Sequence, residues 1–178
     1  NQEIQKFSLS LGQVFNIEEN TDLPSQSSLD QKTSDIVGEM GYNFSEIGSI
    51  NYKFSIDNNL NDLVNSEIST AFDFGALSFN LDYLEQNKHR GTEHYVSSGI
   101  TLNYNDSSEF NFSTKKNFKT DSTEYYDWKY QYQIDCLTAG LLYRREFYHD
   151  SDLDPNDSLM FTVTFVPFGT INSPVQNP

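Results

Sequence analysis

Three histidines lie close to acidic residues in this sequence, a combination that could supply general acid–base catalysis: His89, His94 and His149. His149 and Asp150 are adjacent, so on a β-strand their side chains would point to opposite faces. No serine or cysteine lies in a context that would activate it as a nucleophile. We therefore expect that the chain is not an enzyme and has no catalytic residues.

Four aspartates lie within a short segment, and their spacing resembles that of a calcium-binding loop: Asp150, Asp152, Asp154 and Asp157. Pro155 stands where such a loop needs glycine, and Phe161 stands where it needs a bidentate glutamate. We therefore expect a solvated loop, no metal site and no cofactor. The alternative is a divalent cation that the loop shares with the phosphate groups of a ligand.

Cys136 is the single cysteine of the chain, so no disulfide can form within it. An unpaired cysteine in an exported protein indicates a partner in another segment or a free thiol. The sequence begins at Asn1 without an initiator methionine or a signal peptide, and it enters strand-like sequence almost at once. We expect it to be a fragment of a longer mature protein.

The composition fits half-apolar strands better than a soluble globular core. Apolar residues make up 36% of the chain, yet aromatic residues reach 15%, which disordered segments do not show. The net charge of −15 argues against a nucleic-acid partner. No apolar run approaches the roughly 18 residues that would indicate a membrane helix, whereas a barrel strand needs an apolar side chain only at every second position.

Apolar and polar residues alternate along most of the chain, which predicts β-strands with one apolar face and no helix. The clearest segment is 126–134, where Trp128, Tyr130 and Tyr132 share one face. Ten strands are predicted, at about residues 3–15, 34–45, 49–58, 63–74, 76–85, 93–105, 108–118, 122–134, 137–149 and 158–168. Most of them exceed the roughly 5–6 residues of globular strands and match tilted strands that cross a bilayer.

The predicted connections alternate between long and short. The long or polar ones span residues 16–33, 58–62, 86–92, 118–122 and 149–157, and the short turns lie near Glu46–Gly48, Gly75, Asn105–Ser107 and Asp135–Cys136. Outer-membrane barrels have long external loops and tight periplasmic turns. The pattern therefore predicts an all-β, antiparallel, up-and-down transmembrane β-barrel, with the turn of Cys136 on the oxidising periplasmic side.

Alternation alone does not decide whether the apolar face contacts lipid or fills a soluble core. Strand length, aromatic residues near the strand ends and a polar opposite face favour lipid. The residues that we expect to face lipid are Tyr52, Phe54, Phe79, Leu81, Tyr126, Trp128, Tyr130 and Tyr132. Arg145 is in phase with Leu141 and Tyr143 on this face, close to a long loop, so we expect it at headgroup level, where a cation is tolerated.

Two other classes of protein remain open. A complete ten-stranded outer-membrane barrel, acting as an adhesin or a pore, would pair the strands predicted at 3–15 and 158–168 with each other. A soluble β-barrel that binds a small lipid would turn Trp128 and its apolar neighbours inward, into a dry core.

Two stretches resemble the C-terminal barrel region of the lipopolysaccharide-assembly family LptD, also called OstA. The first runs Phe7-Ser-Leu-Ser-Leu-Gly-Gln-Val-Phe15 and continues at Ser34-Asp-Ile-Val-Gly-Glu39. The second covers Tyr130–Phe147, Asp152–Pro155 and Leu159–Gly169. The resemblance implies that residues 1–169 are the C-terminal part of a larger outer-membrane barrel, followed by a flexible periplasmic tail at 170–178.

The resemblance also implies a translocon of the Gram-negative outer membrane that transports lipopolysaccharide and inserts it into the outer leaflet. Its partners would be lipopolysaccharide, an LptE-like lipoprotein plug, periplasmic bridge proteins bound through an upstream domain, and outer-membrane lipid. The last strand would form one side of a lateral seam, with Leu159, Phe161, Thr162, Val163, Thr164, Phe165, Pro167 and Phe168. Pro167 lacks a backbone donor, so it would either weaken the seam or merely end the strand.

Five further residues have a predicted role: one cysteine through this resemblance, and four cations through their position in the chain. Cys136 matches the position from which the family forms disulfides to its periplasmic domain, although Asp135 stands where some members have a second cysteine. Four cations near the predicted outer surface could contact lipopolysaccharide phosphates: Lys88, Arg90, Arg144 and Arg145. The alternatives are an unpaired thiol at Cys136 and ordinary loop solubility for the cations.

Overall fold

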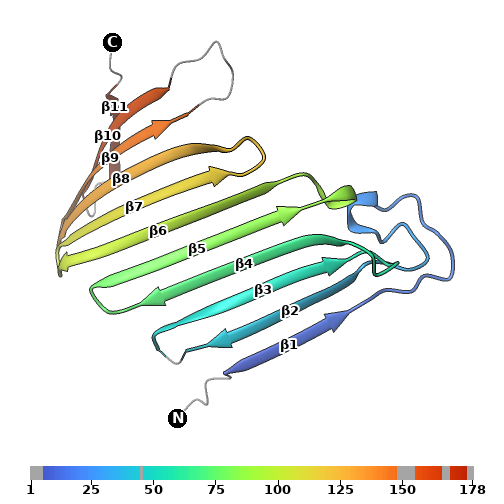
Figure 1. The fold of residues 1–178 in the computed structure, drawn as a ribbon. Helices are drawn as coiled ribbons and strands as arrows, with labels where there is room; N and C mark the ends of the chain where they lie inside the picture. The colour runs from blue at the N-terminus through green and yellow to red at the C-terminus, as the bar shows by residue number, and fades with distance from the viewer. Residues whose placement is uncertain (1–5, 45, 148–154, 166–168, 176–178) are drawn as a thin grey trace. The chain divides into compact units, whose positions relative to one another are not determined.

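A computed structural model describes residues 6–44, 46–147, 155–165 and 169–175, the last segment by its backbone alone. The strands follow one another in the sheet in chain order, from β1 to β11 (Figure 1). In the described part of the chain the helical segments are two short 3-10 turns, η1 (Ser25–Ser27) and η2 (Lys88–Arg90). No helix among these residues is long and apolar enough to cross a membrane.

The first ten strands lie where the alternation predicts them. Their bounds are β1 (Phe7–Gly12), β2 (Ile36–Asn43), β3 (Gly48–Ile56), β4 (Leu63–Asp73), β5 (Leu77–Gln86), β6 (His94–Asn105), β7 (Ser108–Asn117), β8 (Ser122–Ile134), β9 (Leu137–Glu146) and β10 (Asn156–Phe165). β8 agrees with its prediction at both ends. β1 ends earlier than predicted, because beyond Gly12 only an isolated bridge between Phe15 and Thr33 continues the pairing with the next segment.

One strand was not predicted. β11 (Gly169–Val175) pairs antiparallel with β10, from Phe165 opposite Gly169 to Leu159 opposite Val175. The expectation that residues 170–178 form a tail is therefore wrong for 170–175, and 158–168 is not the last strand. The sequence signal was weak because β11 is short, contains Pro174, and has Ser173 at an apolar position of the alternation.

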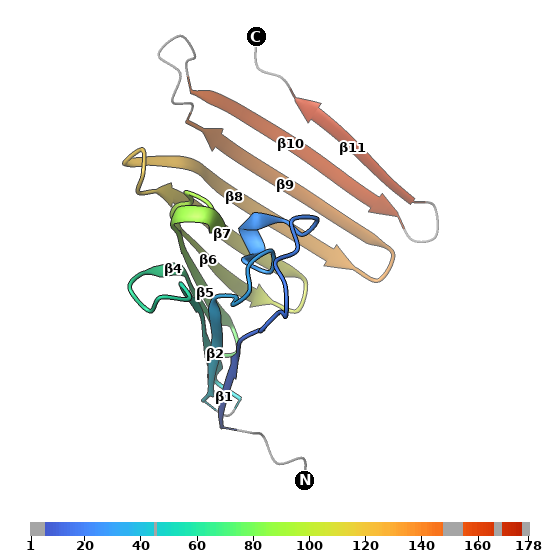
Figure 2. The same ribbon diagram turned by 90° about the vertical axis from the view of Figure 1, so that its right-hand side faces the viewer.

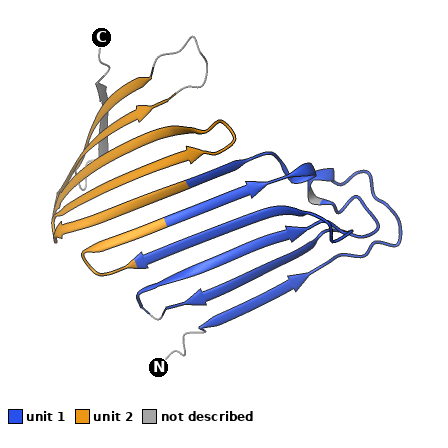
Figure 3. Cartoon of the chain, in the orientation of Figure 1, with its two compact units in different colours: residues 1–72, 81–96 blue, residues 73–80, 97–178 orange. Residues whose placement is uncertain are grey.

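The chain divides into two compact units (Figure 3). Unit 1 comprises residues 1–72 and 81–96, and unit 2 comprises residues 73–80 and 97–178. Unit 1 contains the paired strands β1 to β4, and unit 2 contains the paired strands β7 to β11. In both units the pairing is antiparallel, so long connections and tight turns lie at opposite ends of the strands.

The register gives each unit two distinct faces, because residues opposite one another in neighbouring strands point to the same side. In unit 1 one apolar row is Leu9, Met40, Tyr52 and Ile68, and one polar row is Ser10, Glu39, Lys53 and Glu67. In unit 2 one apolar row is Phe112, Trp128, Tyr143 and Leu159, and one polar row is Ser113, Asp127, Arg144 and Ser158. The predicted alternation is therefore present in three dimensions.

Burial is inverted relative to a soluble protein. Among the described residues, Val64 is the one apolar side chain that is buried. The buried polar or charged residues are Ser28, Ser34, Asp35, Ser55, Ser66, Ser108 and Asp127. A soluble domain buries its large apolar side chains and exposes polar ones. These sheets instead leave their apolar faces uncovered by the described chain, so the faces need apolar surroundings to be stable.

Candidate functional site: the polar faces of the two units

The polar face of unit 1 carries alternating charges across three strands. Glu39 on β2, Lys53 on β3 and Glu67 on β4 lie opposite one another in register. Asn51 on β3 donates a hydrogen bond of 2.6 Å from Nδ2 to Oε1 of Glu39. Opposite charges in cross-strand positions stabilise a sheet, so this row holds the strands together while it presents a wettable surface.

At the loop end of unit 1, connections from distant parts of the sequence meet around the carboxylate of Asp35, which is 3% exposed. Its Oδ2 lies 2.7 Å from Nε2 of His89 and 3.7 Å from Nε of Arg90. Ser55, near the end of β3, donates to the same oxygen over 3.3 Å. Oγ of Ser28 accepts a 2.8 Å hydrogen bond from the Asp35 amide. A buried carboxylate needs such partners to offset its lost hydration.

The long connections of unit 1 also lie beside one another along their backbones. Figures 1 and 2 show the connection that contains η1 beside the one that contains η2, where His89 and Arg90 lie. Asn58, in the connection between β3 and β4, donates from Nδ2 to Oε1 of Gln31 over 3.0 Å. The three long connections of unit 1 are thus joined to one another by side-chain contacts, and the long connection between β1 and β2 is held in place.

Lys88 links its own connection to the one between β3 and β4. Its Nζ lies 3.0 Å from Oδ2 of Asp57 and also forms an ion pair with Asp62. The amide of Asn59 and then the Lys88 ammonium hydrogen-bond to Asp57 and lower the pKa of that carboxyl. The carboxylates of Asp62 and Asp57 raise the pKa of Lys88. Asp57 and Lys88 are therefore both charged at neutral pH, and they neutralise each other in part.

Near the loop end of unit 2, the polar face holds close ion pairs. Arg144 on β9 donates from Nε to Oδ1 of Asp127 over 2.7 Å and from a terminal nitrogen to Oδ2 over 2.6 Å. Its guanidinium lies 5.3 Å from the ring centroid of Tyr125. Lys115 on β7 forms an ion pair of 2.8 Å with Glu124. Cations on this part of the face are bound to carboxylates and carry little free charge.

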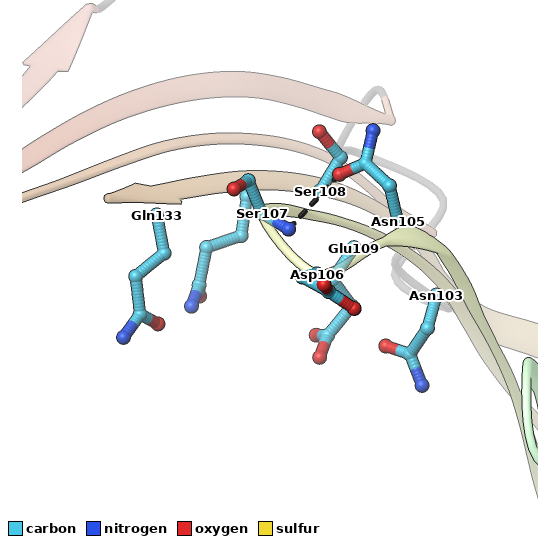
Figure 4. Close-up of a pocket in the computed structure, with 8 residues that line it drawn as sticks. Asn103, Asn105, Asp106, Ser107, Ser108, Glu109 and Gln133 are labelled. Atoms are coloured by element: carbon cyan, nitrogen blue, oxygen red, sulfur yellow. Dashed lines mark hydrogen bonds between the residues drawn. The ribbon is translucent and has the colours of Figure 1, made fainter. Parts of the chain in front are cut away.

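The tight-turn end of unit 2 carries amides and hydroxyls together with two carboxylates. A hollow of about 100 Å³ is lined by the residues that we call the amide ledge: Asn103, Asn105, Asp106, Ser107, Ser108, Glu109, Gln131 and Gln133. Asn103, Glu109 and Gln133 project to the same side in Figure 4. The turn is held by hydrogen bonds from the Ser107 amide to Oδ1 of Asn105 and from the Gln133 amide to the Ser107 carbonyl.

Aromatic rings lie near the ends of the apolar faces. Close to a tight turn of unit 1, the rings of Tyr42 and Phe44 are 4.7 Å apart. Near the loop end of unit 2, Arg145 lies 5.4 Å from the ring centroid of Phe147 and 3.7 Å from Oδ1 of Asp157. Arg145 is opposite Tyr126 in register, which confirms its predicted phase on the apolar face. Aromatic side chains with a partnered cation are typical of the boundary between lipid and water.

Six of the predicted lipid-facing residues have a known register, and it places all of them on the apolar faces: Tyr52, Phe54, Tyr126, Trp128, Tyr130 and Tyr132. Trp128, Tyr130 and Tyr132 are 45%, 44% and 40% exposed. They do not lie in the dry core that a soluble barrel would require. Phe79 and Leu81 lie in β5, and lipid contact at all eight positions stays a prediction.

The four cations predicted to contact phosphate all have carboxylate partners. Lys88 pairs with Asp57 and Asp62, Arg90 with Asp35, Arg144 with Asp127 and Glu146, and Arg145 with Asp157. Their contact with phosphate stays a prediction.

Sequence reasoning missed Lys129, which lies opposite Asn111 on the polar face of unit 2 and has no carboxylate partner within the described residues. Its phase with Gln131 and Gln133 was the signal that could have found it.

The predicted seam residues on β10 are not at an edge, because this strand pairs with β9 on one side and with β11 on the other. With both edges paired, β10 has no free edge for the pairing of 3–15 with 158–168 that the alternative, a complete ten-stranded barrel, would need. Pro167 and Phe168 lie outside the described residues.

The other sequence predictions concern residues of the turns. Cys136 is an exposed free cysteine in the turn between β8 and β9, and as the single cysteine of the chain it leaves the disulfide to an upstream domain a prediction. His89 contacts Asp35, and His94 lies 3.1 Å from the hydroxyl of Tyr83. In the described part of the chain no cluster of side chains could hold a metal ion. His149, Asp150, Asp152 and Asp154 lie outside that part.

Comparison with known proteins adds one match. The sequence model of a protein family, LptD: LPS transport system D, matches residues 1–105, more than half of the chain. The match includes the first resembling stretch, Phe7–Glu39, and ends before the second. No curated protein matches the chain. The family acts in lipopolysaccharide transport and belongs to the outer membrane. The antiparallel strands with their exposed apolar faces agree with this match, and the chain belongs to the LptD family.

Proposed function

We propose that this chain is part of a translocon that carries lipopolysaccharide across the outer membrane and inserts it into the outer leaflet. Membership of the LptD family supports a role in lipopolysaccharide transport. The observation that carries the finer proposal is the inverted burial: Val64 is the one buried apolar side chain among the described residues, while Asp35 and Asp127 are buried with partners.

The two faces match the two parts of this amphipathic lipid. Lipopolysaccharide joins acyl chains, which avoid water, to phosphorylated sugars, which need it. A barrel whose apolar face contacts bilayer lipid and whose polar face lines water can carry the sugars inside while the acyl chains remain in hydrocarbon. The carboxylates and amides on the polar faces would keep that passage hydrated, and the paired cations would not hold the phosphates tightly.

The acyl chains need a lateral exit, and we place it at the outer edge of β11. Within unit 2 this strand pairs with β10, and it is the last of the described strands in the strand order. Backbone groups on an exposed edge are costly in hydrocarbon, so a seam that opens should be weakly paired. Pro174 supports this placement because it has no amide hydrogen and leaves β11 with one donor fewer for any neighbour.

The partners of the translocon follow from the same proposal. An LptE-like lipoprotein would fill the polar interior, and periplasmic bridge proteins would deliver the lipid through a domain upstream of this chain. Cys136, exposed in a tight turn, would lie on the periplasmic side and could bond to a cysteine of that domain. A shift in gel mobility that depends on both reductant and Cys136 would identify such a bond.

The transport proposal is tested by photo-crosslinking in growing cells. A photoreactive amino acid at Asn51, on the polar face of unit 1, should form an adduct with lipopolysaccharide, and the adduct should fade when lipopolysaccharide synthesis is stopped. The matched control is the next residue, Tyr52, on the apolar face, which should crosslink to bulk phospholipid instead. Absence of lipopolysaccharide adducts at Asn51 and at other polar-face positions would refute the proposal.

A further inference from the structure

Three side-chain amides of the amide ledge have unused hydrogen-bonding capacity. The side chains of Asn103, Gln131 and Gln133 make no hydrogen bond within the described part of the chain. Two amides farther along the polar face of unit 2 are used by the protein itself: Nδ2 of Asn111 donates to Thr101 over 2.8 Å, and Nδ2 of Asn117 donates to Glu124 over 3.0 Å. A group of free amides around one hollow is therefore available to a ligand.

The chemistry of the lining selects the kind of ligand. Every lining side chain is an amide, a hydroxyl or a carboxylate, and none is apolar. An amide offers two donors and an acceptor on one rigid group, which suits the neighbouring hydroxyls of a sugar ring. An acyl chain would find no apolar contact here, and a tightly bound peptide would need an apolar anchor.

Lys129 extends the ledge toward the loop end. It lies on the same face of β8 as Gln131 and Gln133, in the order Lys129, Gln131, Gln133 along alternate positions. Because it has no carboxylate partner within the described residues, its ammonium group can take an anion. A ligand that spans these three residues would therefore have hydroxyls at one end and a negative group at the other.

We propose that the amide ledge and Lys129 form a binding site for the phosphorylated saccharide of lipopolysaccharide. The amides of Gln131, Gln133 and Asn103 bind sugar hydroxyls, and Lys129 binds a phosphate. This inference rests on the proposed function and adds a defined sugar contact to it.

Binding at this site should be weak and rapidly reversible. The hollow is small, about 100 Å³, and has no aromatic side chain on which a sugar ring could stack. Each hydrogen bond to the sugar replaces one to water, so little affinity is gained per contact. A transport path requires such weak binding, because the ligand must be able both to enter each site and to leave it.

The test uses the full protein in detergent micelles and a soluble probe, the core oligosaccharide freed from lipopolysaccharide by mild acid. Saturation transfer from protein to sugar protons should be seen with the unmodified protein. In the double variant Gln131→Met/Gln133→Met, which keeps side-chain length and removes the amides, we expect the signal to fall by more than half. The control is Tyr132→Phe on the opposite face, which leaves the hydrogen bonds of the amide ledge intact and should leave the signal unchanged.

A second pair of variants keeps the inference testable if the methionine variant does not fold. Lys129→Gln should weaken binding of the phosphorylated oligosaccharide and spare the same sugar after phosphatase treatment. Folding of each variant is checked by its heat-dependent gel mobility. An unmodified protein that gives no sugar signal, or ledge variants that bind as well as the control, would overturn the inference. If Asn51 still crosslinks to lipopolysaccharide in cells, the proposed function stands although the ledge fails.

Discussion

Arg144 and Asp127 form a two-pronged hydrogen-bonded ion pair across the hairpin of β8 and β9. The two contacts measure 2.7 Å and 2.6 Å, and Asp127 is 8% exposed. Paired arginine–carboxylate hydrogen bonds are stronger and more directional than neutral ones. Because a slip of one strand by one residue would turn its side chain of the pair to the apolar face and separate the two groups, the pair also fixes the register of the hairpin.

Removing one partner of this pair should therefore destabilise unit 2. We expect Arg144→Gln to lower the free energy of unfolding by about 1–2 kcal/mol, since it leaves the buried Asp127 without its main donor, and the partial exposure of Arg144 limits the effect. Asp127→Asn should act similarly. The double variant should lose less than the sum of the two, as measured by urea unfolding followed through tryptophan emission. Strictly additive losses would show that the two side chains do not act as a pair.

Gly38 lies beneath the ring of Phe54 on the apolar face of unit 1. A Cβ atom at Gly38 would lie 2.3 Å from the ring, so Gly38→Ala must displace it. We expect a loss of about 1–3 kcal/mol, the usual range for overpacking, in the same urea assay. Gly140→Ala is the matched control, because its nearest neighbours would lie 3.9 Å away. Equal effects at the two glycines would show that the ring contact is not what excludes a side chain at Gly38.

Asp35 should hold the connection between β1 and β2 in place. We expect Asp35→Asn to weaken the contacts with His89 and Arg90 and to expose the connection to a protease added outside intact cells. A protease that cleaves after large apolar residues would then act at Leu23, which lies in that connection. The control is Asp22→Asn in the same connection, because Asp22 has no ion pair within the described residues. Equal cleavage of the two variants would exclude an anchoring role for Asp35.

The ion pairs of Lys88 with Asp57 and Asp62 should persist over a wide range of pH. The pKa of Asp57 is lowered from 3.8, so the contribution of its carboxylate is complete above that value and is lost as the pH falls through the lowered one. The pKa of Lys88 is raised from 10.5, so its contribution is complete below that value and is lost as the pH rises through the raised one. Between these two pH limits, the rate of proteolysis in the connection between β3 and β4 should not change with pH.

Lys88→Met is the variant that tests this account. The substitution removes the hydrogen bond from Lys88, the second-largest cause of the lowered pKa of Asp57, and leaves the larger one, the hydrogen bond from the Asn59 amide. The pKa of Asp57 should therefore rise only part of the way toward its ordinary value. An acid-active protease should then cut the connection at a higher pH than in the unmodified protein. A profile identical to that of the unmodified protein would mean that Lys88 does not influence Asp57.

The strands could be predicted because alternation and turn residues are local. Asp127 and Arg144 could also have been paired in advance, since they are equally distant from the turn at Asp135–Cys136. The cluster at Asp35 could not, because His89 is 54 positions away and reaches it only through the pairing of several strands. β11 was missed for a local reason, since Pro174 and Ser173 interrupt its pattern.

Trp128 offers a direct test of which face meets lipid, because it is the single tryptophan of the chain. It lies on the apolar face and is 45% exposed. In vesicles whose acyl chains carry bromine, its fluorescence should be strongly quenched, whereas iodide in the water should have little effect. The double variant Trp128→Phe/Lys129→Trp moves the tryptophan by one residue, to the polar face at nearly the same depth. Its fluorescence should respond to iodide and hardly to bromine. The reverse result, or equal quenching of both proteins by both agents, would mean that these strands do not separate hydrocarbon from water, and the transport proposal would fail with them.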